Sequence, residues 1–255
     1  MDFLVSSNTD VGAVKTTNQD SLSALVLGTP QGKMVFTVLC DGMGGLEHGE
    51  LASASVVRTF RNWATTILPE LCQEPLEDAV IRQHWQGIVT EMNKRIQEYS
   101  AEKQTRMGTT AVVMLLTQGR YYIMNVGDSR AYELTDHICQ LTEDHSVVAR
   151  ELNAGRITPE EAEHHPKRNV LTQCVGASKE VYGDMFFGRV KKNAVYMLCS
   201  DGFRHEISPD ELYDILQPGV LRNEHAMREN AQKLIALNKQ RGEDDNISVV
   251  LVRTF

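Results

Sequence analysis

Two apolar runs of the chain each end in an Asp-Gly step. The first is Val38-Leu39-Cys40-Asp41-Gly42, and the second is Met197-Leu198-Cys199-Ser200-Asp201-Gly202. A hydrophobic strand that stops at Asp-Gly delivers a carboxylate to the rim of a sheet, because glycine lets the backbone turn sharply away and leaves room beside the acid. The two runs therefore predict strands that present Asp41 and Asp201 at a sheet edge.

Two further acidic segments follow a similar pattern. Gly127-Asp128 comes after the apolar residues 121–126, and Asp244-Asp245-Asn246 precedes the last apolar run. Clustered carboxylates repel one another unless a cation lies among them, and oxygen ligands without a histidine or thiolate set favour a hard divalent ion. Each aspartate alone is also ordinary turn chemistry, and spacing alone does not show that the four converge. Together they indicate a metal-dependent enzyme.

The size and charge of the chain narrow its class. With 255 residues, of which 42% are hydrophobic and 24% charged, the composition is that of a soluble globular protein with a substantial core. A formal net charge of −8 disfavours a nucleic-acid or anionic-membrane surface, since either needs a basic face. We expect no nucleic-acid partner. We also expect no membrane insertion, because no apolar run is long enough to cross a bilayer.

The cysteines and the first residues predict the compartment. The five cysteines are scattered without a C-x-x-C pair, and Cys40 and Cys199 lie in strand runs, where cysteine acts as a small hydrophobe. The start, Met1-Asp2-Phe3-Leu4-Val5, lacks the basic region and apolar stretch of a signal peptide. We expect a cytoplasmic protein. A soluble domain of a membrane protein stays open as an alternative.

The apolar periodicity predicts clustered strands and paired helices. Strands are expected at residues 3–7, 21–27, 34–40, 109–116, 121–126, 131–134, 186–190, 195–199 and 246–252. Helices are expected at about 50–67, 77–101, 143–153 and 222–238, with short helices capped at Thr158 and Ser208. Strict β-α-β alternation is absent. The pattern favours an α+β fold, with antiparallel sheet and outer helices in one compact domain.

The expected helix at 77–101 carries a long apolar stripe. Its members recur at three- and four-residue steps and are Ile81, Trp85, Ile88, Met92, Ile96 and Tyr99. Such spacing gathers side chains on one face of a helix. We therefore expect the whole stripe to face a core.

Two familiar catalytic or binding loops are disfavoured. The turn Gly42-Met43-Gly44-Gly45 is similar to a nucleotide-binding loop, but Glu47 stands at the third dinucleotide glycine. Glu50 stands at the P-loop lysine, where an acid repels phosphate. The segment Gly127-Asp128-Ser129-Arg130-Ala131 lacks the last glycine of a nucleophile elbow, and the residues after it predict a strand instead of a helix. Neither nucleotide binding nor serine hydrolysis is expected.

The eight histidines show no H-E-x-x-H pattern or other zinc spacing. Most are expected on the surface. His48 and His145 lie near the acidic motifs and are candidates for proton transfer.

Six ordered motifs resemble those of the PPM (PP2C-like) protein serine/threonine phosphatases, and the match runs from about residue 6 to 252. They are Thr9-Asp10-Val11-Gly12…Asn18-Gln19-Asp20, Leu39-Cys40-Asp41-Gly42-Met43-Gly44-Gly45, Met107-Gly108-Thr109-Thr110, Val126-Gly127-Asp128-Ser129-Arg130, Ser200-Asp201-Gly202 and Asp244-Asp245-Asn246. The Asp-Gly-Met-Gly-Gly form resembles that of bacterial members. The resemblance implies an α-β-β-α sandwich of two antiparallel sheets flanked by helix pairs. It also implies a single domain over residues 1–255, with a mobile flap at about 145–176.

The resemblance also implies two or three divalent cations, Mn²⁺ or Mg²⁺. Asp41 would bridge two ions, with the Gly42 carbonyl on one, and Asp201 and Asp245 would complete the other. These three aspartates would carry catalysis, since a water held between two cations supplies hydroxide that attacks phosphorus in line. No protein nucleophile is then needed.

Two other acids complete the implied metal set. Asp20 would hold a metal-bound water, and Asp128, with help from Asp201, would bind a weaker third ion found in bacterial members. The assignments of Asp20 and Asp128 come from the resemblance alone.

Two positions depart from the family pattern. Lys15 stands where the first motif usually carries the arginine that binds the substrate phosphate. Because lysine offers a point charge where arginine offers two parallel hydrogen bonds, we expect weaker phosphosubstrate binding. Leu46 stands where many bacterial relatives have histidine, so the proton donor would be another group, such as His48 or water.

We therefore expect a phosphatase that acts on phosphoserine and phosphothreonine in proteins, opposes a bacterial Ser/Thr kinase and is a monomer. Its partners would include the kinase or its substrates. One alternative is a pseudophosphatase that binds phosphoproteins without turnover, and another is a phosphatase that resets an anti-sigma-factor antagonist. The intact set of Asp41, Asp201 and Asp245 favours catalysis, whereas Lys15 favours the pseudophosphatase.

Overall fold

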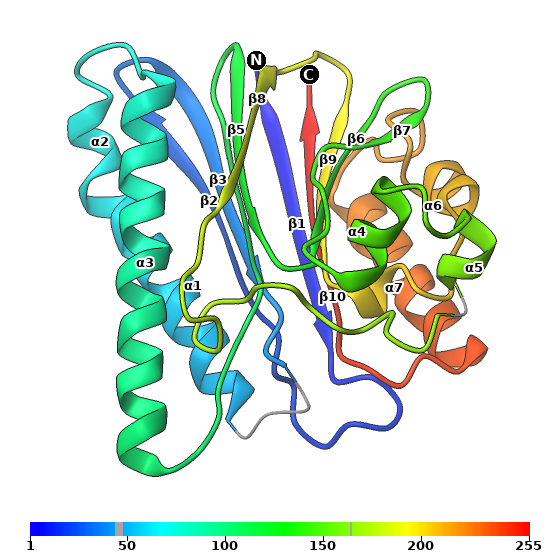
Figure 1. Ribbon diagram of the computed structural model, residues 1–255. Helices are drawn as coiled ribbons and strands as arrows, with labels where there is room; N and C mark the ends of the chain where they lie inside the picture. Colours follow the sequence, from blue (N-terminus) through cyan, green and yellow to red (C-terminus); the bar gives the residue numbers. More distant parts are fainter. Residues whose placement is uncertain (44–47, 164) are drawn as a thin grey trace.

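Two five-stranded antiparallel sheets lie face to face in the computed structural model, which describes residues 1–43, 48–163 and 165–255 (Figure 1). Sheet A has the order β1 (Phe3–Asp10), β10 (Ile247–Thr254), β9 (Val195–Cys199), β6 (Arg130–Leu134) and β7 (Ile138–Gln140). Sheet B has the order β2 (Ser21–Thr29), β3 (Gly32–Cys40), β4 (Ala111–Leu116), β5 (Arg120–Val126) and β8 (Asp184–Arg189).

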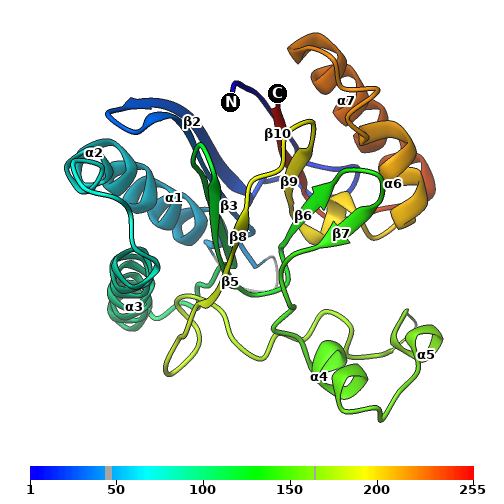
Figure 2. The same ribbon diagram turned by 90° about the horizontal axis from the view of Figure 1, so that it is seen from above.

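Helices cover the outer face of each sheet (Figure 2). Helices α1 (Gly49–Thr66) and α3 (Asp78–Lys103) lie on sheet B, and α6 (Pro209–Leu216) and α7 (Glu224–Arg241) lie on sheet A. The shorter elements are α2 (Leu68–Leu71), α4 (Val147–Asn153), α5 (Pro159–Glu163) and the 3₁₀ turn η1 (Asp201–Phe203). The expected α-β-β-α sandwich is confirmed. None of the helices in the described ranges combines the length and apolar character that a membrane span requires.

The central strands are apolar on both faces because each is enclosed between two layers. In β3, Met34, Phe36, Val38 and Cys40 pack against the α1/α3 layer, whereas Val35 and Leu39 pack between the sheets. Successive side chains of a strand point to opposite faces, so a continuous apolar run serves two cores. This explains why the runs that end at Asp41 and Asp201 are uninterrupted.

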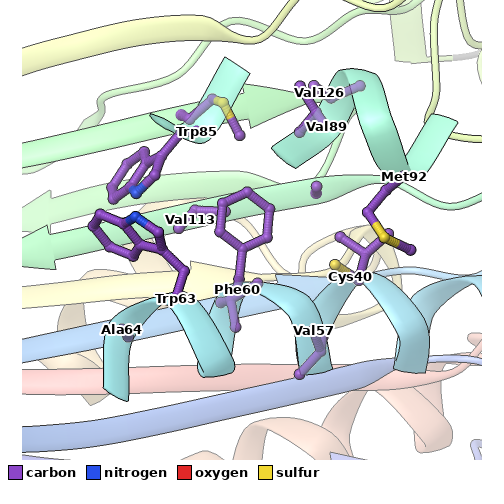
Figure 3. Close-up of a cluster of buried hydrophobic side chains, with 14 of the residues drawn as sticks. Cys40, Val57, Phe60, Trp63, Ala64, Trp85, Val89, Met92, Val113 and Val126 are labelled. Carbon is purple, nitrogen blue, oxygen red and sulfur yellow. The ribbon is translucent and has the colours of Figure 1, made fainter. Parts of the chain in front are cut away.

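The core under the helix pair of sheet B is built around aromatic rings (Figure 3). The Trp85 ring lies 5.7 Å from Trp63, 6.2 Å from Phe36 and 6.3 Å from Phe60, between ring centroids and in edge-to-face arrangements. Such pairs add to the burial energy of large rings. They fix α1 and α3 against the sheet.

The stripe expected on α3 is wrong at one position, because Tyr99 is 41% exposed. Ile88 is partly buried and packs against the same core as the other members of the stripe, and Val89 is buried beside it. The 26 residues of α3 span roughly 39 Å at about 1.5 Å per residue. The nine-residue strands span roughly 30 Å. The last turns of α3 therefore extend past the sheet and leave Tyr99 in solvent.

Short elements and caps account for the remaining differences. Helix α2 and strand β7, of four and three residues, were absent from the sequence prediction because periodicity needs longer windows. The helix expected at 143–153 begins at Val147, where the Ser146 side chain caps it. Both predicted capping boxes, at Thr158 and Ser208, are confirmed by reciprocal hydrogen bonds.

Truncation of the central ring should destabilise the fold strongly. We expect Trp85→Ala to lower the free energy of unfolding by about 3–5 kcal/mol, since it opens a cavity among close-packed rings. Tyr99→Ala, on the exposed end of the same helix, should cost less than about 1 kcal/mol. Urea denaturation of both variants measures this. Equal losses would contradict the assignment of Trp85 to the core.

Candidate metal centre and active site

The strand ends bring three of the predicted acids to one end of the sandwich. Strands β3 and β9 end at Cys40 and Cys199, immediately before Asp41 and the Ser200-Asp201 step. Strand β10 runs antiparallel to β9, with Val249 opposite Cys199, so Asp245 lies just before the start of β10 at that same end. Packing of the two sheets face to face then places all three residues at a common rim.

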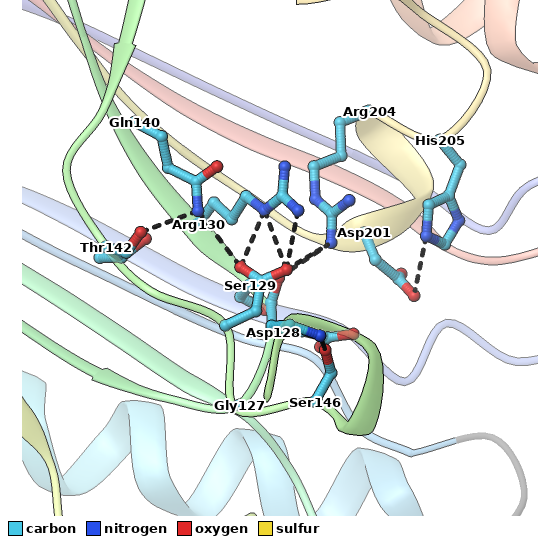
Figure 4. A network of polar contacts seen from close by, with 12 residues as sticks. Gly127, Asp128, Ser129, Arg130, Gln140, Thr142, Ser146, Asp201, Arg204 and His205 are labelled. Atoms are coloured by element: carbon cyan, nitrogen blue, oxygen red, sulfur yellow. Dashed lines mark hydrogen bonds and ion pairs between the residues drawn. The ribbon is translucent and has the colours of Figure 1, made fainter. Parts of the chain in front are cut away.

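Two neighbouring strands bring Asp20 and Asp128 to the same end. Ser21 pairs with Cys40, so Asp20 precedes β2 beside the end of β3. Arg130 pairs with Cys199, which brings Asp128 to the end of β9. Figure 4 shows Asp128 and Asp201 on facing loops. All five predicted aspartates therefore gather at one end of the fold.

A cleft of about 1380 Å³ opens at this end. Its walls include Lys15, Asp41, Asp128, Asp201 and Asp245, together with Asp244. Asp20 is only 8% exposed and lies outside the lining of the cleft.

Gly42 is needed for a close backbone approach. A Cβ at this position would lie 2.5 Å from the carbonyl oxygens of both Gln19 and Gly49. Only glycine therefore lets the chain leave Asp41 along this path, as the Asp-Gly step predicts.

The carboxylates influence one another strongly. Burial, reinforced by repulsion from Asp20 and Asp201, raises the pKa of Asp41 well above its ordinary value. Burial and the nearby Asp201 raise the pKa of Asp128 to about 7. Burial likewise raises the pKa of Asp20 to about 7, with repulsion from Asp201 and Asp245 as smaller contributions. A pKa raised in this way is typical of a buried carboxylate that has no nearby cation to offset its charge.

Asp201 differs from its neighbours. Burial by itself would raise the pKa of this carboxyl, but His205 and Arg204 outweigh burial and hold the pKa below its ordinary value. Asp201 therefore stays ionised more readily than Asp20, Asp41 and Asp128.

The donor set fits divalent cations. Both carboxylate oxygens of Asp20 are buried, and neither accepts a hydrogen bond of ordinary geometry. The nearby Ser248 and Ser200 hydroxyls lower the pKa of Asp20, but burial outweighs them. Such a buried acid is costly unless it is protonated or lies beside a cation. Within the described ranges, no three His, Cys, Asp or Glu side chains already form a group that could hold an ion. Mutual repulsion opposes such a close group, and a divalent cation would offset it. The ligand roles of Asp20, Asp41, Gly42, Asp128, Asp201 and Asp245 therefore stay predictions.

Residues 13–238 match the family model described as protein phosphatase 2C. The chain belongs to this family. The serine/threonine phosphatase stp of Listeria monocytogenes is 33% identical over 96% of this chain and 93% of the relative. The protein phosphatase PhpP of Streptococcus pneumoniae is 30% identical over 97% and 96% of the two chains.

Solved structures agree with this assignment. The S. agalactiae serine/threonine phosphatase superposes with a TM-score of 0.83 at 29% identity over 100% of both chains. The catalytic domain of the phosphatase PstP, in complex with two manganese ions, superposes with a TM-score of 0.77 at 29% identity over 98% and 97% of the two chains. The predicted protein serine/threonine phosphatase is confirmed, and so is dependence on divalent metal. The comparisons give the pseudophosphatase no support.

Lys15 lies in the acidic cleft of this PP2C-family phosphatase. Its ammonium nitrogen is 3.1 Å from a carboxylate oxygen of Asp245. Burial lowers the pKa of Lys15, but Asp245, Asp244 and Asp41 outweigh burial and raise it. The lysine is therefore a fixed cation beside the predicted metal ligands.

Sequence reasoning missed His205, Arg204 and Glu243. His205 lies 3.7 Å from Asp201 and 3.4 Å from Glu243, and its side chain is only 24% exposed, so it is an exception to the expectation that most histidines lie on the surface. Glu243 accepts hydrogen bonds from the backbone N–H groups of Asp244 and Asp245. Each of the three lies one to four residues from a motif aspartate, and this closeness in sequence is the signal that could have identified them.

A polar network holds the Asp128 loop against η1 (Figure 4). Arg204 donates a hydrogen bond of 3.1 Å to the Asp128 carbonyl. Arg130 forms a two-pronged ion pair with Asp144, at 2.8 and 2.7 Å. Because Arg204 also lies 3.7 Å from Asp144, that carboxylate joins both arginines. The network fixes Asp128 relative to Asp201.

The threonine motif orients Asp41. The Thr109 hydroxyl donates to the Asp41 carbonyl at 2.8 Å, and the Asp41 N–H donates to the Thr110 hydroxyl at 2.9 Å. The Thr110 N–H also donates to the Asp41 carbonyl at 2.8 Å. This explains why Met107-Gly108-Thr109-Thr110 belongs to the motif set.

The two candidate proton donors differ in their surroundings. His145 Nδ1 accepts from the Gly127 N–H at 3.2 Å, and its Nε2 lies 3.0 Å from Asp184, so both ring nitrogens are engaged. His48 is more exposed and lies 3.5 Å from Glu50. The departure noted at Leu46 lies outside the described residues.

The raised carboxyl pKa values predict that stability without metal falls as pH rises. Between pH 3.8 and about 7, Asp20 and Asp128 keep their protons in the fold but lose them in the unfolded chain. Each group then lowers the free energy of unfolding by about 1.4 kcal/mol per pH unit. Melting temperatures in EDTA should therefore fall from pH 5 to 7, and stabilisation by Mn²⁺, which binds ionised carboxylates, should grow.

The matched control is Asp20→Asn, which should flatten the pH slope in EDTA. Carboxyls with a lowered pKa, such as Glu211 at about 2, give the opposite slope up to their ordinary pKa of 4.5, so melting temperatures are compared between pH 5 and 7. A melting temperature in EDTA that rises from pH 5 to 7 would contradict this account.

Proposed function

We propose that the chain hydrolyses phosphoserine and phosphothreonine in proteins, with Mn²⁺ or Mg²⁺ held by Asp41, Asp201 and Asp245. The observation that carries the proposal is the meeting of these carboxylates in one cleft with the cation Lys15. Membership of the protein phosphatase 2C family supports the substrate class. Phosphoryl transfer needs positioning and charge stabilisation more than covalent chemistry, and such a cleft supplies both.

Divalent cations bound here would lower the pKa of water toward neutrality and neutralise charge on the phosphoryl oxygens. The protein's own residues orient the reaction. The backbone of Asp41 is held by Thr109 and Thr110, which fixes the carboxylate before substrate binds. Lys15 would bind a phosphoryl oxygen, sharing its charge between substrate and Asp245.

We further propose two tightly bound ions and a weaker third. The first two would be held by Asp41, Asp201, Asp245 and the Gly42 carbonyl. Asp20 would orient a metal-bound water. Asp128 would hold the third with Asp201. The buried, unpaired carboxylate of Asp20 and the raised pKa of Asp128 support these roles.

Residues 145–176 are proposed as a flap within a single phosphatase domain of residues 1–255. The ends of this segment are joined, since the Thr172 N–H donates to the His145 carbonyl at 2.8 Å and the Val147 N–H to the Val170 carbonyl at 2.9 Å. Residues 169–174 line the cleft. A segment closed on itself beside the site is suited to gate access.

The proposed setting is a cytoplasmic monomer that opposes a bacterial Ser/Thr kinase. The relatives named serine/threonine phosphatases support phosphoprotein substrates, including the kinase or its targets. The five cysteines are unpaired, which is typical of a reducing compartment.

Loss of one predicted ligand should abolish turnover. We expect Asp201→Ala to lower Mn²⁺-dependent release of p-nitrophenol from p-nitrophenyl phosphate at least about a hundredfold, because a bound cation contributes several kcal/mol. The control is Asp214→Ala, which removes an exposed aspartate of α6. Both are assayed with and without Mn²⁺ after circular dichroism confirms folding. Full activity of Asp201→Ala would refute the ligand assignment.

Restoring the arginine should strengthen substrate binding. Arginine can form two parallel hydrogen bonds to a phosphate where lysine offers one point charge, so Lys15→Arg should lower KM for phosphopeptides about fivefold. The expected change is in KM, with kcat nearly constant. Steady-state kinetics on a phosphothreonine peptide measures both, and an unchanged KM would remove the claim.

A further inference from the structure

The cleft extends beyond the carboxylates along a second wall. This wall consists of the end of α3, the residues that lead into β4, and the segment after the flap. Its lining includes Gln97, Arg106, Met107, Ser178, Lys179 and Glu180. The predicted metal chemistry uses none of these residues, so the wall is free to contact other parts of a substrate.

Arg106 stands next to the backbone that orients Asp41. Two residues along the chain, the Gly108 carbonyl accepts a hydrogen bond of 3.1 Å from the Met43 N–H. The neighbouring Thr109 holds the Asp41 carbonyl. The Arg106 side chain is exposed to solvent and lines the cleft. Its position is therefore tied to that of the catalytic rim.

Lys179 is carried on equally well-fixed backbone. The buried Asn93 side chain of α3 donates to the Ser178 carbonyl at 3.0 Å. Thr109 and Val175 exchange two backbone hydrogen bonds of 2.9 Å, which join this segment to the threonine motif. Lys179 is exposed and lines the same cleft. Both cations therefore project from backbone that is fixed relative to Asp41.

The charged residues that line the cleft differ in their pairing. Neither Arg106 nor Lys179 forms an ion pair with any residue in the described part of the chain, whereas Lys15 is paired with Asp245. Glu180, which follows Lys179 in the chain, accepts a hydrogen bond from the Tyr182 hydroxyl at 3.0 Å. The cleft thus combines the carboxylates at the strand ends with a second wall that carries two cations without an ion-pair partner among the described residues.

We propose that Arg106 and Lys179 form an anion subsite that binds an acidic side chain adjacent to the phosphorylated residue of the substrate. The shared chemistry is a carboxylate of Asp or Glu, or a second phosphate. This specificity subsite rests on the proposed phosphatase function. A peptide whose phosphothreonine lies beside the carboxylates of the cleft would extend along the second wall. There the attraction between its acidic side chain and the two cations favours binding and fixes the orientation of the peptide.

The test compares phosphothreonine peptides that differ only beside the phosphothreonine. At each of three positions on either side, the peptides carry Glu, phosphoserine or neutral Gln. The readout is the ratio of kcat/KM for the acidic peptide to that for the neutral one, with Mn²⁺ present. Loss of phosphate from the phosphothreonine alone is followed by mass spectrometry, because a flanking phosphoserine is itself a possible substrate. Because both kcat/KM values are measured on the same enzyme, their ratio does not depend on the fraction of enzyme molecules that is active.

The wild type should favour acidic peptides about tenfold at the best position, mainly through KM. Arg106→Gln and Lys179→Gln should each lower the ratio about threefold, and the double variant should bring it close to one, since each exposed charge pair contributes modestly and the two losses combine. High salt should lower the wild-type ratio. A larger ratio for phosphoserine than for Glu would identify a second phosphate as the preferred anion. A larger ratio for Glu would identify a carboxylate. Either result supports the subsite.

The control variant is Lys192→Gln. This exposed lysine precedes β9, at the opposite end of that strand from Asp201, and its loss should leave the ratio unchanged. Equal kcat/KM for acidic and neutral peptides in the wild type would overturn the subsite, as would an undiminished ratio in the double variant. Failure of the phosphatase function would instead appear as no Mn²⁺-dependent hydrolysis of any peptide.

Discussion

Repulsion between buried carboxylates is the constraint around which this fold is arranged. Asp20, Asp41 and Asp128 lie close enough to Asp201 for its charge to raise their pKa values, and burial adds to the effect. A hydrophobic sandwich would avoid such a cluster unless it served cations. The two uninterrupted cores on either side of β3 supply the stability that offsets the cost of the acidic rim.

The cationic side chains around the cluster offset this repulsion at some of the aspartates more than at others. His205 and Arg204 stabilise the charge of Asp201, and Lys15 pairs with Asp245. Burial and other acids dominate the surroundings of Asp20 and Asp41, although the charge of Lys15 also interacts with Asp41. The protein's own cations therefore offset only part of the repulsion, and divalent ions held by Asp41, Asp201 and Asp245, as proposed above, would offset the rest.

Much of the fold and of the site could be predicted from the sequence. The runs that end at Asp41 and Asp201 predicted their strands because a strand enclosed on both faces is apolar throughout. The exposure of Tyr99 could not be predicted from the sequence, because it depends on where α3 extends past the end of the sheet. His205 was missed because its partner Glu243 is distant in sequence, and only the packing of η1 against the start of β10 joins them.

The threonine motif has a consequence for how such enzymes diversify. Thr109 binds the Asp41 carbonyl through its hydroxyl and Val175 through its backbone. One residue thus joins the backbone of Asp41 to the segment that carries Val175. A substitution in residues 174–178 that displaced Val175 would also disturb the hydrogen bonds that orient Asp41, so changes in this segment are constrained by the acid on the other side of Thr109.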